Sequence, residues 1–306
     1  MTAHKKNVVA SVLARLRNMA DQGDRSFNDV LQAYVIERFL ARLAQTSEAD
    51  TLLLKGALML QVWGVPRARP TIDIDVLRRG AADRDSLMAI VWKCASTINE
   101  TDGVTFDASN LAVESIHEAG GYVGTRIRVP AKLDKVRQVV QIDFGVGDAV
   151  YPSPVIIEYP VLLGGAPLKL RAYPVEATIA EKFHAMVHLD LANSRMKDFY
   201  DVWILSRTLE FDGQALSKAI KSTFERRESP IPTAPPVALT ERFSGDAGHI
   251  RQWDAFVARI DELSLQRGLP TVIKAIAEFL MPPTIAAAER KPLRSRWTPK
   301  GGWTSL

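Results

Sequence analysis

Cysteine is almost absent from this chain of 306 residues. The single residue, Cys94, excludes an intrachain disulfide and a zinc site built on cysteines. A chain without disulfides is typical of a reducing compartment, so we expect a cytoplasmic protein.

Long apolar runs are also lacking. The run over residues 52–65 contains Lys55 and Gln61 and is too short to cross a bilayer. Arg15 and Arg17 interrupt the N-terminal apolar segment, which is typical of an amphipathic helix and not of a signal peptide. We therefore expect no membrane association.

The chain has little excess charge of either sign. The 39 Lys and Arg residues against 35 Asp and Glu leave a net charge of +4, which suits a protein that handles polyanions but does not require one. Basic residues cluster only at the C-terminus, interleaved with Trp297 and Trp303. Two interpretations of this tail stay open: contact with RNA through phosphates and base stacking, or a packed or disordered terminus.

The spacing of apolar residues divides the chain into four parts. We predict N-terminal helices over 1–50, a mixed α/β core over 51–175, a helical region over 176–285 and a basic tail over 286–306. Short, hairpin-like strands favour a mixed or antiparallel sheet over a regular βαβ array, so we predict an α+β fold.

The individual elements follow from the same periodicities. The expected helices cover 7–20, 28–46, 57–63, 82–99, 176–191, 195–208, 213–226, 246–264 and 269–281, and the expected strands cover 51–55, 72–77, 104–106, 111–116, 122–129, 138–144 and 155–159. Ser26 or Asn28 is expected to cap the second helix, and the last helix is expected to end before Pro282.

Two aspartates alternate with two isoleucines in the segment Ile72-Asp73-Ile74-Asp75. Alternate residues of a strand point to the same face, so the carboxylates of Asp73 and Asp75 lie side by side. Such a pair repels itself without a cation, and carboxylate oxygens are ligands of Mg²⁺. The pair predicts a metal site; the alternative is a surface strand with two functionless aspartates.

A third carboxylate, Asp143, occurs in another predicted strand. Three carboxylates on adjacent strands are typical of two-metal phosphoryl-transfer sites. Upstream, Gly56 follows an apolar strand and precedes a helix, a place where a backbone can approach phosphates. Arg67, Arg69 and Thr71 lie between this turn and the aspartate pair.

Two helical segments carry further charged residues. Lys182 can hold a triphosphate as a point charge, the alternative being a solvated lysine. Asp198 and Asp201 fall on one helix face at a spacing of three residues, beside Arg195 and Lys197. The alternative for these acids is helix capping, because acids are favourable in a first turn.

Taken in order, these motifs resemble the AbiEii/AbiGii family of nucleotidyltransferase toxins, which includes the MenT toxins of mycobacteria. The matching segments are Lys55–Gly56, Arg69-Pro-Thr-Ile-Asp-Ile-Asp75, Glu181–Lys182 and Arg195-Met-Lys-Asp-Phe-Tyr-Asp201. The likeness runs from about Leu52 to Trp203, roughly half of the chain.

The resemblance implies a fold similar to DNA polymerase β nucleotidyltransferases, extended by helices, and a reaction that uses Mg²⁺ and an NTP. It implies catalytic roles for Asp73, Asp75 and Asp198, nucleotide binding by Gly56, Arg69, Thr71 and Lys182, and metal binding by Asp73, Asp75 and Asp143. There is one departure. The polymerase-like family often has Gly-Ser or Gly-Gly in its first motif, and Gly56–Ala57 lacks that hydroxyl contact to phosphate.

Members of the family act as toxins paired with an AbiEi-type antitoxin, and some resemble enzymes that add nucleotides to the tRNA 3′ end. We therefore predict a type IV toxin that transfers nucleotides from NTP to RNA, with tRNA as the expected acceptor, and so blocks translation. Two alternatives stay open: the same reaction on a protein or small molecule, and a degenerate member that only binds a nucleotide or partner.

Overall fold

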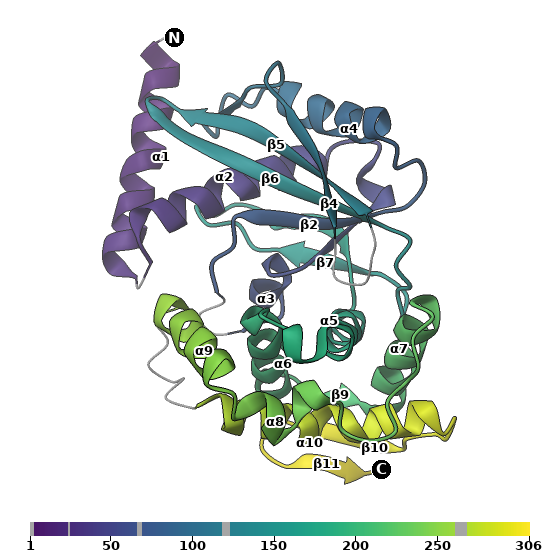
Figure 1. Ribbon diagram of the computed structural model, residues 1–306. Coiled ribbons are helices and arrows are strands. Elements are labelled where there is room, and N and C mark those ends of the chain that lie inside the picture. Colours follow the sequence, from purple (N-terminus) through teal and green to yellow (C-terminus); the bar gives the residue numbers. More distant parts are fainter. Residues whose placement is uncertain (1–2, 24, 66–68, 118–122, 261–267) are drawn as a thin grey trace.

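Two lobes, each with its own hydrophobic core, make up the computed structural model (Figure 1). It describes residues 3–23, 25–65, 69–117, 123–260 and 268–306. Arg67 lies outside these described residues.

The bounds of the elements are as follows. The helices are α1 (Ala3–Gln22), α2 (Phe27–Leu43), α3 (Leu58–Val62), α4 (Arg84–Ser96), α5 (Val175–Leu189), α6 (Met196–Thr208), α7 (Gly213–Arg226), α8 (Glu241–Ser244), α9 (Ala247–Ile260) and α10 (Leu269–Ala288). The strands are β1 (Leu52–Lys55), β2 (Asp73–Arg78), β3 (Thr105–Phe106), β4 (Ala112–His117), β5 (Val123–Leu133), β6 (Val136–Val146), β7 (Val155–Tyr159), β8 (Leu168–Ala172), β9 (Phe211–Asp212), β10 (Ser295–Thr298) and β11 (Gly302–Ser305).

The large sheet has the order β3-β5-β6-β2-β1-β8-β7, and β4 also pairs with β5. The pairs β2–β6 and β1–β8 are parallel and the others are antiparallel, which confirms the predicted mixed sheet. β8 was not among the predicted strands. Its sequence alternates apolar Leu168, Leu170 and Ala172 with Lys169 and Arg171, a signal that could have located it. It pairs with β7 along its length and with β1 at a single register pair, Leu54 with Ala172.

One face of this sheet is buried under α1, α2 and α4 (Figure 1). Ile74 and Val76 of β2 point into that core, which leaves Asp73 and Asp75 on the opposite face. The side chain of Ser26 accepts a hydrogen bond from the Asp29 amide and caps α2, as predicted. Residues 1–50 thus share a core with the sheet.

The second core joins α5, α6, α7 and α10 with the C-terminal residues. The tail forms β10 and β11, and β10 pairs with β9. Trp297 is buried and its indole N–H donates to the Ser206 carbonyl oxygen at 2.6 Å, while Trp303 stacks on Phe279. Of the two interpretations of the tail, the packed terminus is therefore the one observed, and both tryptophans are occupied inside the protein.

The prediction that the last helix ends at residue 281 is wrong, because α10 continues through Pro282 and Pro283 to Ala288. A proline has no N–H, so Pro283 leaves the carbonyl oxygen of Phe279 without its helical partner. The indole N–H of Trp303 donates to that oxygen at 2.9 Å. A distant side chain thus satisfies the group that local sequence rules leave unpaired.

By length and composition α10 would suffice to cross a membrane, the only helix in the described ranges of which this is true. Its apolar side chains, among them Val272, Ile276 and Leu280, instead pack within the second core.

Candidate active site

A row of four charged side chains crosses the sheet on the face turned away from α2. Lys55 is paired in register with Asp75, Asp75 with Asp143, and Asp143 with Arg126. Residues directly opposite one another on neighbouring strands share a face. The strand pairing therefore places two adjacent carboxylates between two cations.

Arg126 holds both carboxylate oxygens of Asp143. Its Nε and Nη2 donate at 2.8 and 2.7 Å, a two-pronged ion pair that fixes the orientation of Asp143. Sequence reasoning missed Arg126. The alternation in β5 puts Arg126 and Arg128 on one face, but only the register with β6 shows what they oppose.

Asp73 and Asp75 are less compensated. Burial, together with repulsion by Asp143 and Asp73, raises the pKa of Asp75 to about 6, although Lys55 opposes the rise. Burial and the Asp143 charge also raise the pKa of Asp73, whose carboxylate accepts a hydrogen bond from the Gln141 amide. Among the described residues, the Asp75 carboxylate has neither a hydrogen-bond partner nor a salt bridge. This pair is therefore the place in the row where a cation would be stabilised most.

Gly56 makes room for this arrangement. Its φ of +73° is a conformation that glycine adopts readily, and a Cβ atom at this position would lie 2.0 Å from Oδ2 of Asp75. The turn after β1 must therefore be glycine for Asp75 to keep its position.

The helical lobe faces this row with a cluster of ion pairs. Lys182 Nζ lies 2.8 Å from Oδ1 of Asp198 and 2.7 Å from Oδ2 of Asp201. Arg69 donates twice to Asp201 at 2.8 Å, and Arg195 donates to Asp198 at 2.5 Å. Three cations thus surround two carboxylates.

Asp198 and Asp201 are fully buried, which disfavours a simple capping role. Burial alone would raise the pKa of each, but Lys182 with Arg195 or Arg69 lowers it below its usual range. Both carboxylates are therefore permanently ionised near neutral pH and hold the cations in place. Lys182 is likewise not the solvated lysine of the alternative interpretation, because it is paired with both.

A third group joins β1 to α5. Lys55 Nζ lies 2.8 Å from Asp148 and 3.2 Å from Glu181, and Arg227 donates to Asp148 at 2.7 Å. Burial raises the pKa of Glu181 to about 7, while Lys55 opposes that rise. These pairs connect the two lobes beside the aspartate row.

A cavity of about 430 Å³ lies between the sheet and the helices. It is lined by the predicted site residues Gly56, Arg69, Asp73, Asp75, Asp143, Lys182 and Asp198. Seven cationic and five acidic side chains line it altogether. The sequence analysis did not single out Arg126, Arg227 or Thr178 as members of this wall.

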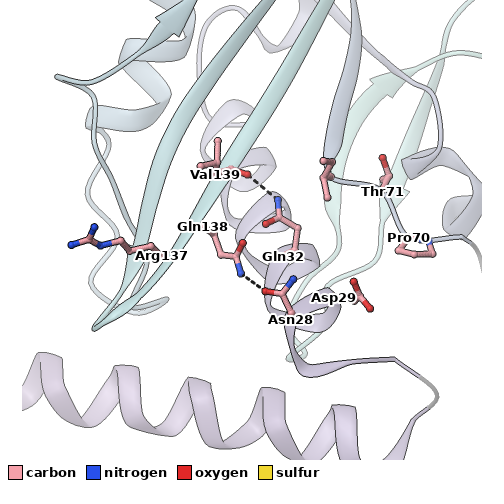
Figure 2. Close-up of a pocket in the computed structure, with 9 residues that line it drawn as sticks. Asn28, Asp29, Gln32, Pro70, Thr71, Arg137, Gln138 and Val139 are labelled. Carbon is pink, nitrogen blue, oxygen red and sulfur yellow. Dashed lines mark hydrogen bonds between the residues drawn. The ribbon is translucent and has the colours of Figure 1, made fainter. Parts of the chain in front are cut away.

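Thr71 is the predicted site residue that does not line this cavity. Its hydroxyl accepts a hydrogen bond from the Asp73 N–H at 3.2 Å, and it lines a neighbouring pocket with Asn28 and Gln138 (Figure 2). In this structure Thr71 therefore positions the start of β2.

The acids fit a cation only in part. Within the described ranges, no three His, Cys, Asp or Glu side chains converge closely enough to enclose a metal ion. Mg²⁺, however, is commonly held by one or two carboxylates together with substrate phosphates and water. Asp73 and Asp75 supply two such carboxylates, whereas both oxygens of Asp143 are held by Arg126.

Comparison with known proteins agrees with this geometry. The family described as nucleotidyl transferase AbiEii toxin, type IV toxin–antitoxin system, matches residues 38–280. No curated protein matches the chain. The fold is similar to that of MenT4, a nucleotidyltransferase toxin from Mycobacterium tuberculosis, with 16% identity and a TM-score of 0.51 over 87% of this chain and 98% of that one.

A second similar structure is JHP933 from Helicobacter pylori, with 15% identity and a TM-score of 0.50 over 87% of this chain and 95% of that one. The family match spans most of the chain and includes the whole aspartate row and the ion-pair cluster around Lys182. The chain therefore belongs to the AbiEii family of type IV toxin–antitoxin systems and is a nucleotidyltransferase.

Proposed function

We propose that this nucleotidyltransferase transfers a nucleotide from an NTP to an RNA acceptor, with a divalent cation, and that tRNA is the acceptor through which it blocks translation. The observation that carries the proposal is the division of charge in the cavity. Acids outnumber cations among the sheet residues that line it, whereas on the opposite side the cations, among them Lys182, Arg69 and Arg195, outnumber the acids. A metal–triphosphate complex has the complementary charge distribution.

The residues of β2 suit a magnesium ion. Asp73 and Asp75 would hold it, and Asp143 would neutralise Arg126 beside them. When bound, the ion would supply charge stabilisation to the transferring phosphoryl group. Burial first, and repulsion by neighbouring carboxylates second, raise the pKa values of both aspartates, and a bound cation would oppose both effects.

The helix side would bind and orient the triphosphate. Asp198 and Asp201 hold Lys182 and Arg69 in fixed geometry, so those cations need little reorganisation when phosphate oxygens arrive. The low pKa of Asp198 makes it a weak proton acceptor, which favours a positioning role over that of a general base.

An RNA acceptor is proposed because the chain is basic and belongs to this toxin family. Membership also implies an antitoxin partner, for which we propose an AbiEi-like protein, and we propose that the reaction takes place in the cytoplasm. These assignments follow from the family and not from a particular contact.

The test is a labelling assay. Purified protein with Mg²⁺, bulk tRNA and each labelled NTP in turn should label the RNA, and Asp73→Asn should abolish the label. Asp85→Asn is the matched control, since Asp85 is an exposed acid on α4 behind the sheet. Label on protein or on a small molecule with blank RNA would favour the other acceptors. Nucleotide binding without any transfer would favour a binding role.

A further inference from the structure

The face that carries the aspartate row continues outward along β5 and β6. In β5, Ile127, Val129, Ala131 and Leu133 are buried under α2 and α4, while the alternate residues Arg126, Arg128, Pro130 and Lys132 lie on the aspartate face. Figure 1 shows α2 and α4 behind these two strands, with no helix in front of them. This face is therefore open to a partner.

Cations outnumber acids on the open face, where Glu114 of β4 pairs with Arg128 at 2.8 Å and with Arg126 at 3.6 Å. Beyond the Asp143–Arg126 pair, the next rows are Gln141 with Arg128, Val139 with Pro130, and Arg137 with Lys132. Each row is two residues further along the strand, or about 7 Å. The face therefore extends about 20 Å from the aspartate row. We name it the β5–β6 face.

Arg137 and Lys132 are both exposed and directly opposite one another. Like charges in register on one face of a sheet repel, and the repulsion is relieved when an anion lies between them. By the same reasoning, a cation stabilises the aspartate pair. At the Arg137–Lys132 end of the face, the bound ion would be an anion.

A second pocket adjoins the β5–β6 face (Figure 2). It has a volume of about 360 Å³ and is lined by Ile72 and Val139, whose exposed fractions are 62% and 46%. Ile72 directly precedes Asp73, so this apolar surface lies beside the catalytic strand. Ile72 and Val139 thus offer an apolar wall to a ligand in this pocket, which polar groups also line.

Amide groups surround these apolar side chains. Gln138 donates to Asn28 at 2.9 Å, and Gln32 donates to the Val139 carbonyl at 3.0 Å (Figure 2). Among the described residues, the side-chain oxygen of Gln138 (Oε1) and the side-chain nitrogen of Asn28 (Nδ2) have no hydrogen-bond partner. An apolar surface bordered by an amide donor and an amide acceptor suits a planar nucleobase, whose faces are apolar and whose edges are polar.

We propose that the β5–β6 face binds the backbone of single-stranded acceptor RNA and that the Ile72–Val139 pocket receives a nucleobase near its reacting end. The inference rests on the proposed function. The phosphates would lie along Arg137 and Lys132, and the strand would lead its terminal hydroxyl toward Asp73 and Asp75. The proposed contact does not include the basic tail, in which Trp297 is buried in the second core and Trp303 packs against it.

The test compares two pairs of exposed cations. Lys132→Ala with Arg137→Ala removes two from the β5–β6 face, and Arg290→Ala with Arg294→Ala removes two from the tail. Binding of a short fluorescein-labelled single-stranded RNA is followed by anisotropy over a range of salt. Each lost phosphate contact makes the negative slope of log K against log salt shallower by about 0.7. The slope of the face variant should therefore be shallower by about 1.4, and the slope of the tail variant should not change.

Catalysis gives an independent readout. The face variant should raise KM for RNA without changing KM for NTP, and Val139→Glu should do the same by placing a carboxylate in the base pocket. Wild-type protein that labels no RNA would overturn the proposed function. Wild-type labelling with unchanged binding and KM in the face variants, or a loss confined to the tail variant, would overturn the docking surface alone.

A different observation concerns Thr178. It lines the catalytic cavity from α5, on the same helix face as Glu181, Lys182 and Ala185. Thr178 is 5% exposed, and its hydroxyl has no hydrogen-bond partner among the described residues. A buried hydroxyl without a partner costs free energy, and one that faces a cavity can regain it from a ligand.

The same cavity is lined by Gly56 and Ala57, and Ala57 has no hydroxyl where the Gly-Ser form of the polymerase-like pattern has one. The structure assigns to Thr178 the hydroxyl contact to a triphosphate oxygen that Ala57 lacks. Thr178 is thus a positioning residue for the NTP, supplied by a helix instead of the turn. This second inference also rests on the proposed function.

Thr178→Val tests it, because valine keeps the shape and removes the hydroxyl. Loss of one hydrogen bond to a charged oxygen should weaken binding of a non-hydrolysable NTP analogue about tenfold in calorimetry. The free energy of unfolding should not fall, since an unpaired group is removed. Thr284→Val is the control: its hydroxyl donates to the Leu280 carbonyl, so stability should fall and NTP binding should not change.

Rescue distinguishes a phosphate contact from a packing effect. Ala57→Ser in the Thr178→Val background should restore most of the lost affinity. Unchanged affinity in Thr178→Val, or no recovery with Ala57→Ser, would overturn the assignment. Because the readout is analogue binding, either result is independent of whether RNA is the acceptor.

Discussion

Replacing Gly56 with alanine should separate the geometry of the site from the stability of the protein. The new Cβ would lie 2.0 Å from Oδ2 of Asp75, and ordinary contact begins at 3.4 Å, so the carboxylate must move by about 1.4 Å. Misplacing a reacting group by about 1 Å can cost about 100-fold in rate. We therefore expect kcat for nucleotide transfer to fall at least about 100-fold.

The backbone contribution can be measured separately with Gly64→Ala. Gly64 has a φ of +68°, close to that of Gly56, and a Cβ there would meet nothing within 4 Å. Both variants should lose about 1–2 kcal/mol of stability from the left-handed conformation, as measured by urea unfolding. Only Gly56→Ala should lose activity.

Two results would refute this reasoning. The first is a Gly56→Ala variant that keeps more than about half of the wild-type kcat, because Asp75 would then tolerate displacement. The second is an equal loss of activity in Gly64→Ala, because backbone strain and not the position of Asp75 would then explain the effect.

Three further expectations concern stability. In metal-free protein the pKa values of Asp75 and Glu181 are raised to about 6 and 7, so the stability gained from protonating them in the folded state is complete below pH about 4 and is lost as pH rises through 7. The free energy of unfolding in urea should therefore decline from about pH 4 to about pH 7, and Mg²⁺ with NTP should reverse the decline. A flat profile would contradict this expectation. Trp303→Phe removes the donor to the Phe279 carbonyl and should cost about 1–3 kcal/mol by the same method, with no loss pointing to another donor. Asp198→Asn leaves buried cations short of a partner and should cost about 3–5 kcal/mol; a thermally unaltered variant would show that the pairs are solvated.

Much of the fold could be predicted because its elements have strong local patterns. The prediction of α7 has the observed bounds, and alternation located β2, β4 and β6 to within a few residues. The aspartate pair could be recognised for the same reason, since Asp73 and Asp75 are close in sequence. The family assignment rested on motif order and is confirmed by the match over residues 38–280.

What could not be predicted depends on pairing between distant segments. Arg126 faces Asp143 only because β5 and β6 adopt one register, and a shift by one residue would turn Arg126 into the core. The path of α10 through two prolines depends on an indole that is 20 residues beyond Pro283. Neither the register of β5 with β6 nor the hydrogen bond from Trp303 can be read from the local propensity of the residues.

The hydrogen bond from Trp303 to α10 also links the last strand to the candidate active site. Trp303 lies on β11, Phe279 lies on α10, and both pack in the core that contains α6. Asp198 is on α6, so its position depends on a core that residues near position 300 complete. A change at Trp303 therefore acts on the ion-pair cluster around Lys182 through the packing of α10 against α6, without any direct contact with the cavity.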